Sequence, residues 1–256
     1  MNYKQKENID NENENRISVD VTTDDNAIIH CEITGKQDAH ALIFLHGNGE
    51  NLHIFDKQVS YFSQYYRTIA IDTRGHGKST RGTEPFDFYT FSSDLKNVLK
   101  ALKIDKANIV GFSDGANIAL QLAVFMPDVV SSMILLGANY NPKGLKMTLR
   151  LYLLLVYVFL TTISLFSKEY RKRKEIWGLM IHHPDILITE LKQITAPTLV
   201  VTGEKDLIRK HHNDMICNSI KECQRLEIKG GNHFWIFKKP EILNQIIIDF
   251  LQKHIK

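Results

Sequence analysis

The fold of this chain is decided by one short stretch, which reads Asn108-Ile109-Val110-Gly111-Phe112-Ser113-Asp114-Gly115-Ala116-Asn117-Ile118-Ala119-Leu120. A β-branched segment leads into Gly-Phe-Ser-Asp-Gly, and an Ala/Leu-rich segment follows at once. G-x-S-x-G between a predicted strand and a predicted helix is typical of the sharp turn that exposes a nucleophilic serine. Glycine is needed on both sides because a Cβ there would clash with neighbouring backbone. The free N–H groups of the following helix then point toward Ser113.

The length and composition are those of an ordinary globular protein. With 256 residues, the chain is long enough for one domain with a substantial core, or one domain carrying an insertion. A net charge of +3, with no basic stripe that carries interleaved aromatic residues, does not predict nucleic-acid binding. The N-terminus lacks the apolar core of a signal peptide, which favours a cytoplasmic location. We therefore expect a cytoplasmic protein that binds a small molecule and no nucleic acid.

The three cysteines predict neither a disulfide framework nor a zinc site. Cys31, Cys217 and Cys223 are odd in number and form no C-x-x-C pattern. We expect them to be buried or chemically idle thiols. The sequence contains no metal-ligand spacing and no phosphate-binding glycine loop, so it implies no metal and no cofactor.

The order of the predicted elements indicates a mostly parallel sheet. Residues 1–16 are rich in Asn, Glu and Lys with almost no apolar residue, and we expect a disordered tail there. Eight later segments have the apolar patterns of strands, at residues 17–21, 27–33, 41–45, 68–71, 108–112, 132–137, 197–203 and 225–228. Helical patterns separate most of them, which is the alternation of a parallel sheet. The alternation is interrupted over residues 139–195.

Four further motifs follow predicted strands. They are His46-Gly47-Asn48-Gly49, Asp72-x-Arg74-Gly75-x-Gly77-x-Ser79, Gly203-Glu204-Lys205-Asp206 and Gly230-Gly231-Asn232-His233. With the serine motif, their order and spacing resemble the α/β-hydrolase fold family. The resemblance implies a mostly parallel eight-stranded sheet flanked by helices, with a core of residues 17–138 and 196–256 and a helical cap insertion at residues 139–195. It also implies a catalytic triad in the chain order serine, acid, histidine.

Three residues are the candidates for this triad. Ser113 is the candidate nucleophile, which needs an adjacent base; the alternative is a structural serine in a tight turn. His233 follows the last strand, and an imidazole titrates near neutrality, so it can accept and return the serine proton. Asp206 would fix the tautomer of that imidazole. Glu204 in the same loop and Asp214 beyond it are the alternative acids, since residues 137–139 contain no carboxylate.

The other polar motif residues have structural interpretations. His46, His76, Asp72 and Arg74 stand in motifs where such residues support loop geometry. Four further histidines follow no predicted strand, and we expect them on solvated surface or on the insertion: His182, His183, His211 and His212.

The resemblance also implies an oxyanion hole made of backbone groups. Its donors would be the N–H of Asn48, after His-Gly, and the N–H of Asp114, after the nucleophile. Two preorganised donors stabilise a tetrahedral intermediate. The Asp114 carboxylate has two interpretations: it caps the N-terminus of the following helix, which we favour, or it attracts a cationic substrate.

The insertion contains residues 151–166, which carry no charge and are flanked by basic residues. A transmembrane helix is disfavoured because the run is short, and because the strands before and after it belong to one sheet. The run could rest on an anionic membrane surface as an interfacial helix. Alternatively, it is apolar on all sides because it lines a pocket and packs on the core, which we favour.

These features predict a serine hydrolase that cleaves a carboxylic ester with a small or medium apolar acyl group through an acyl-enzyme. The substrate would be a small apolar ester. The same triad could serve an aminopeptidase-like amidase, a carbon–carbon bond hydrolase or an acyltransferase. A hypothesis of another class is a non-catalytic or membrane-associated binding module on the same fold, whose members usually lack one of the three residues.

Overall fold

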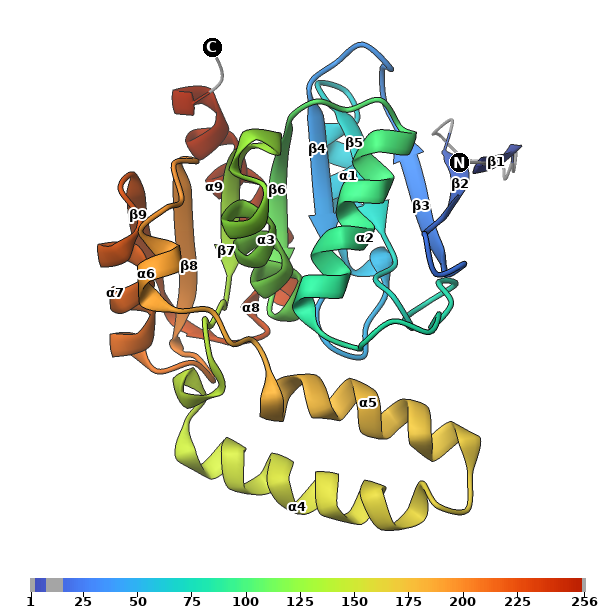
Figure 1. The fold of residues 1–256 in the computed structure, drawn as a ribbon. Helices are drawn as coiled ribbons and strands as arrows, with labels where there is room; N and C mark the ends of the chain where they lie inside the picture. Colours follow the sequence, from blue (N-terminus) through green and yellow to red (C-terminus); the bar gives the residue numbers. More distant parts are fainter. Residues whose placement is uncertain (1–2, 8–15, 255–256) are drawn as a thin grey trace.

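The computed structural model describes residues 3–7 and 16–254, and their strands form one sheet (Figure 1). The strand order is β1-β2-β3-β5-β4-β6-β7-β8-β9. The strands are β1 (Tyr3–Glu7), β2 (Ile17–Thr22), β3 (Ile28–Thr34), β4 (Ala41–Leu45), β5 (Arg67–Ile71), β6 (Ala107–Phe112), β7 (Val130–Leu136), β8 (Thr198–Lys205) and β9 (Cys223–Asn232). Strands β4 to β9 pair in parallel, and β1, β2 and β3 add an antiparallel edge. The predicted mostly parallel sheet is confirmed.

Helices cover both faces of the sheet, because alternate strand residues point to opposite sides. In β4, Ile43 and Leu45 join the core cluster of one face, while Leu42 and Phe44 join the other. The helices are α1 (Asp56–Phe62), α2 (Phe88–Ala101), α3 (Asp114–Phe125), α4 (Met147–Ile163), α5 (Lys168–His182), α6 (Ile188–Leu191), α7 (Lys210–Ser219), α8 (Trp235–Lys238) and α9 (Pro240–His254), with the short turns η1 (Leu52–Phe55), η2 (Pro127–Val129) and η3 (Pro142–Gly144). Helices α2, α3, α6 and α7 cover the first face, and α1, α8 and α9 the second.

The N-terminal segment differs from the predicted tail over residues 1–16. Its β1 strand pairs antiparallel with β2, with Tyr3 opposite Val21 and Glu7 opposite Ile17. A sheet edge offers unpaired backbone N–H and C=O groups that an extended segment of any composition can satisfy. The low apolar content of the segment therefore did not exclude a strand. The rest of the predicted tail, apart from Arg16, lies outside the described residues.

The insertion forms an antiparallel helical hairpin of α4 and α5, and α5 lies between α4 and the sheet (Figure 1). We expected the apolar run to line a pocket and pack on the core, and the structure shows this for only one side of the helix. In α4 only Leu153 and Leu160 are buried, whereas Leu155 is 63% exposed. The reason is that a two-helix hairpin covers only one side of its outer helix. Among the described residues, no helix combines the length and apolar character needed to cross a membrane.

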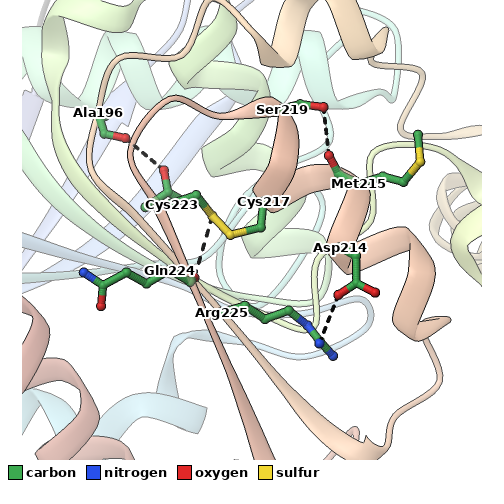
Figure 2. The surroundings of a disulfide bond; sticks show 9 residues. Ala196, Asp214, Met215, Cys217, Ser219, Cys223, Gln224 and Arg225 are labelled. Atoms are coloured by element: carbon green, nitrogen blue, oxygen red, sulfur yellow. Dashed lines mark hydrogen bonds and ion pairs between the residues drawn. A yellow bond between two sulfur atoms is a disulfide. The ribbon is translucent and has the colours of Figure 1, made fainter.

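A disulfide bond joins Cys217 of α7 to Cys223, the first residue of β9 (Figure 2). Their Cα atoms are 5.2 Å apart across the turn between the helix and the strand. Beside it, Arg225 forms an ion pair with Asp214. The expectation of unpaired thiols is thus wrong for two cysteines, because it relied on motif spacing and could not include the turn that brings them together. Cys31 is a buried free thiol.

Candidate active site

Ser113 lies on the turn between β6 and α3, at the carboxyl edge of the parallel strands. Its backbone has φ 52° and ψ −115°, a conformation that non-glycine residues rarely adopt. The turn is anchored because the Ser113 N–H donates to the carbonyl of Leu136 on the neighbouring strand, at 2.8 Å. A Cβ at Gly111 would overlap the backbone of Gly115, and a Cβ at Gly115 would overlap the carbonyl of Leu45. The two glycines are therefore required for the close approach of α3 to β4 and β6.

The structure brings Ser113, His233 and Asp206 into one hydrogen-bonded chain. His233 Nε2 lies 3.2 Å from Ser113 Oγ, and His233 Nδ1 lies 2.8 Å from Asp206 Oδ1. Asp206 also accepts from the backbone N–H groups of Gly203 and Ile208, both at 3.1 Å. Burial acts to raise the pKa of Asp206, but the contact with His233 and these N–H groups outweigh it and hold the pKa below its usual value. Asp206 is therefore a fixed carboxylate at neutral pH.

The two alternative acids have other partners. Glu204 accepts from the N–H of Gly230 at 2.7 Å, and Asp214 pairs with Arg225. Neither carboxylate contacts the His233 ring. Of the three predicted acids, the geometry brings only Asp206 to the imidazole.

The position of the His233 ring depends on a glycine at the end of β7. Gly137 has φ +69°, and a Cβ built on it would lie 2.6 Å from His233 Cε1. On another side, the ring of Phe112 lies with its centroid 5.1 Å from that of His233. The imidazole thus fills a slot between the end of β7 and the residue that precedes the nucleophile.

Asn48 and Asp114, the predicted oxyanion residues, line one cavity with Ser113. Within the described part of the chain, neither of their backbone N–H groups donates a hydrogen bond to another protein group. The Asn48 side chain donates to Asp114 Oδ2 and to the carbonyl of Ile176 on α5, both at 2.8 Å. The Asp114 carboxylate therefore holds the loop that carries Asn48. Burial raises the pKa of Asp114 to about 6.

Glu50 is a residue of this site that the sequence reasoning missed. Its Oε2 accepts from the N–H of Gly47 at 2.9 Å, and it lines the cavity beside Ser113. Burial raises the pKa of Glu50 to about 7, against the opposing effect of the Gly47 hydrogen bond. The available signal was an acidic residue directly after the His-Gly-Asn-Gly motif.

The cavity has a volume of about 270 Å³, and its walls are mainly apolar. The cap side is formed by residues of α4 and α5, and the sheet side by the loops after the strands. The apolar lining consists of Phe112, Leu145, Leu149, Ile176, Trp177, Met180, Leu207, Ile208 and Phe234. Such a cavity accommodates a small apolar group next to Ser113.

Four of the other histidines named in the sequence analysis are buried or line the cavity. His46 and His76 are buried, and His46 Nε2 accepts from the N–H of Thr73 at 3.0 Å, the loop-supporting role predicted for it. His212, which we expected on the solvated surface, is instead buried and stacked on Tyr140 at 4.0 Å. It accepts from the Tyr140 N–H and so ties the start of α7 to the chain after β7. His183 lines the cavity.

Asp72 and Arg74 also have the structural role predicted for them. Asp72 accepts from the N–H groups of Leu52 and Lys78, both at 2.8 Å. Arg74 is buried and bridges Asp25 and Asp94, each at 2.7 Å. These contacts hold the loop after β5 in place.

Known proteins resemble this chain in sequence and in fold. A family model described as alpha/beta hydrolase fold matches residues 40–162. Human "Serine hydrolase BPHL" is 28% identical over 250 residues, which cover 88% of this chain and 83% of the relative.

Two solved structures extend the comparison. The α/β-hydrolase enzyme MGS-M2 from a Medee basin deep-sea metagenome library has a TM-score of 0.80 at 20% identity, covering 91% of this chain and 97% of that one. Carboxylesterase CesB from Bacillus subtilis has a TM-score of 0.74 at 20% identity, covering 92% and 91%. On its sequence motifs, its sheet topology and these similarities, the chain has the α/β-hydrolase fold.

Proposed function

We propose that this protein is a serine hydrolase that cleaves a carboxylic ester with a small or medium apolar acyl group. The observation that carries the proposal is the chain of contacts from Ser113 Oγ through His233 to Asp206, at the floor of an apolar cavity. The similarity over most of the chain to a human protein named as a serine hydrolase supports it. The cavity volume of about 270 Å³ suits a small or medium group more than a bulky one.

In the first half of the reaction, Ser113 Oγ attacks the ester carbonyl carbon while His233 Nε2 takes the hydroxyl proton. The carbonyl oxygen becomes an oxyanion, which the backbone N–H groups of Asn48 and Asp114 stabilise. The carbon–oxygen bond to the alcohol then breaks, and His233 returns its proton to the leaving oxygen. The product of this half is an acyl-enzyme on Ser113 and a free alcohol.

In the second half, His233 takes a proton from water, and the resulting hydroxide attacks the acyl carbon. The second tetrahedral intermediate collapses by breaking the bond to Ser113 Oγ, which receives the proton from His233. Asp206 stabilises the imidazolium that forms in each half. The acid is released and the enzyme is restored.

The test is hydrolysis of short-chain p-nitrophenyl esters together with labelling by a fluorophosphonate probe. The Ser113→Ala variant should lose about 10⁶-fold in kcat and all labelling, because the nucleophile is removed. Ser60→Ala, a change on the exposed surface of α1, is the matched control and should retain both. Wild-type protein that neither turns over esters nor labels, or a Ser113→Ala variant that labels like wild type, contradicts the proposal.

A panel of esters, amides and thioesters of one acyl group separates the proposal from its alternatives. Ester hydrolysis should have the largest kcat/KM. A larger kcat/KM for the amides would indicate an aminopeptidase-like amidase. Transfer of the acyl group to an added alcohol in place of water would indicate an acyltransferase. In either case the assignment to ester hydrolysis would be wrong while the triad would remain.

A further inference from the structure

Helix α4 has apolar residues on two opposite sides. The inner side packs on α5 and the cap core, where Leu153 is buried among Trp177, Met180 and Ile181. The other side, which we call the outer face, consists of Met147, Leu151, Leu155, Val158 and Phe159, followed by Phe166 in the turn to α5. Their exposed fractions range from 57% to 86%. The spacing of these residues at three and four positions places them along one stripe of the helix.

Helix α4 lies farther from the sheet than α5 (Figure 1), and the side chains of its outer face are exposed. Among the described residues, no element covers it. A contiguous apolar surface of this kind marks an interaction site, because soluble proteins rarely leave one in water.

Basic residues stand at both ends of α4. Lys143, Lys146 and Arg150 precede or begin the helix. Lys168 and Arg171 follow the turn at its other end, where Arg171 donates to the carbonyl of Ser164. The acidic residue Glu169 at that end pairs with Arg173. A second copy of the chain on this face would bring such basic ends together in a two-fold contact, which costs free energy. Anionic headgroups complement these basic ends instead, because opposite charges attract near the membrane surface.

We propose that the outer face of α4 docks on the surface of an anionic lipid membrane. The helix would lie flat, with its apolar side chains at the boundary between headgroups and acyl chains and its basic ends among the headgroups. This interfacial arrangement uses the run of residues 151–166 without a membrane crossing.

A second hollow in the hairpin borders both this face and the cavity that contains Ser113. A groove of about 310 Å³ lies between α4 and α5, with Leu151 and Leu154 at its outer side and Met180 at its inner side. Met180 also lines the cavity that contains Ser113. On the proposed function, on which this step rests, docking would let the apolar part of a lipid ester enter along the groove.

The first experiment measures flotation with vesicles of phosphatidylcholine alone or with one-third phosphatidylglycerol. Wild-type protein should float with the anionic vesicles and much less with the neutral ones. The Leu155→Asp/Phe159→Asp variant should bind at least about tenfold more weakly, because two outer-face side chains become charged. The control is Tyr65→Asp/Ile242→Asp, which makes the same charge change at exposed apolar residues of other surfaces and should bind like wild type.

A second variant tests the charge. Lys146→Gln/Lys168→Gln should weaken binding to the anionic vesicles by about tenfold or more and leave binding to neutral vesicles unchanged. The binding of wild type should also weaken as salt rises, because screening shortens the reach of the headgroup charge.

Several outcomes would overturn docking on lipid. The first is no flotation of wild type with anionic vesicles, and the second is equal flotation of wild type and the Leu155→Asp/Phe159→Asp variant. The third is that wild type forms a dimer, that the variant is a monomer, and that neither protein binds vesicles. The last result would identify a second copy as the occupant of the outer face.

The failure of docking can be distinguished from the failure of the proposed hydrolysis. Ser113→Ala should float like wild type, and Leu155→Asp/Phe159→Asp should hydrolyse a short soluble ester like wild type. A short-acyl ester of a long-chain alcohol, presented in anionic vesicles, should be hydrolysed at least about tenfold more slowly by Leu155→Asp/Phe159→Asp than by wild type. Equal rates on that substrate would exclude the passage along the groove.

Discussion

The carboxyl edge of the sheet and the outer helix of the cap are constructed in opposite ways. At the sheet edge, Ser113, His233 and Asp206 each make contacts within the molecule that fix their positions. In α4, the inner side is held by the molecule, but the outer face has no described contact. The residues of the sheet edge are held by contacts within the protein. The outer face of α4 is covered only when it docks on the proposed membrane surface.

This difference follows from how each region is encoded. The sheet edge is specified by short motifs at strand ends, where backbone geometry positions a side chain to within a hydrogen bond. The hairpin is specified by apolar content alone, and apolar content does not say which surface will be covered. Substitutions should therefore have large, specific effects on chemistry at the sheet edge and effects in α4 that depend on the side of the helix.

The largest effect in this comparison is expected for Asp206→Asn. The amide keeps the size of the carboxylate but removes the charge that fixes the His233 tautomer, so kcat should fall about 10⁴-fold. Glu204→Gln, in the same loop but without contact to His233, is the control and should stay within a few-fold of wild type. A kcat for Asp206→Asn within tenfold of wild type would remove Asp206 from the triad.

In the hairpin, Leu153→Ala and Leu155→Ala are a matched pair on opposite sides of α4. Leu153 is 2% exposed and Leu155 is 63% exposed. Truncation of Leu153 should cost about 3 kcal/mol of unfolding free energy through lost packing and a cavity, whereas truncation of Leu155 should change it by less than about 0.5 kcal/mol. Urea denaturation without lipid measures both. Equal losses would mean that the outer face is covered within the protein.

At the sheet edge, Gly137→Ala tests how tightly His233 is held. The new methyl group would meet His233 Cε1 at 2.6 Å and displace the ring. A shift of the base of this size should lower kcat by about 10²-fold. Gly230→Ala is the control, since Gly230 also has φ +69° but has open space at its Cβ position. If both variants lose activity equally, backbone strain and not the position of the ring is responsible.

The sequence predicted much of the fold because its signals are local. The continuous apolar run at residues 41–45 was placed at the observed bounds of β4. The candidate triad was also predicted from motifs, and His233 lies within hydrogen-bond distance of both Ser113 and Asp206. A strand end followed by a glycine turn fixes where a side chain points, so order and spacing carry this information.

The features that the sequence did not predict depend on tertiary contacts between different segments of the chain. The apolar run of α4 has the same composition on its inner and outer sides, and only the hairpin geometry separates Leu153 from Leu155. His212 is buried by stacking on Tyr140, which is distant in sequence. Cys217 and Cys223 meet across a turn whose shape no spacing rule contained.

Glu50 gives the last and smallest prediction, and it shows that the sheet edge retains a group that costs stability. Its pKa is raised by burial to about 7 from an ordinary 4.5, with a contribution from the nearby Asp114. The folded state therefore keeps a proton that the unfolded chain loses above pH 4.5. The stabilisation is complete below pH 4.5 and is lost as the pH rises through 7.

Glu50→Gln removes this titration while the side-chain oxygen can still accept from the Gly47 N–H. The variant should match wild type near pH 4.5 and exceed it at pH 8 by about 2 kcal/mol, the effect of the pKa shift reduced for partial solvent exposure. Urea denaturation at the two pH values measures the difference, with Glu241→Gln on the exposed surface of α9 as the control. A difference that is the same at both pH values would mean that folding does not raise the pKa of Glu50. No such pH-dependent gain is expected from Leu155→Ala in α4, because that change removes no titrating group.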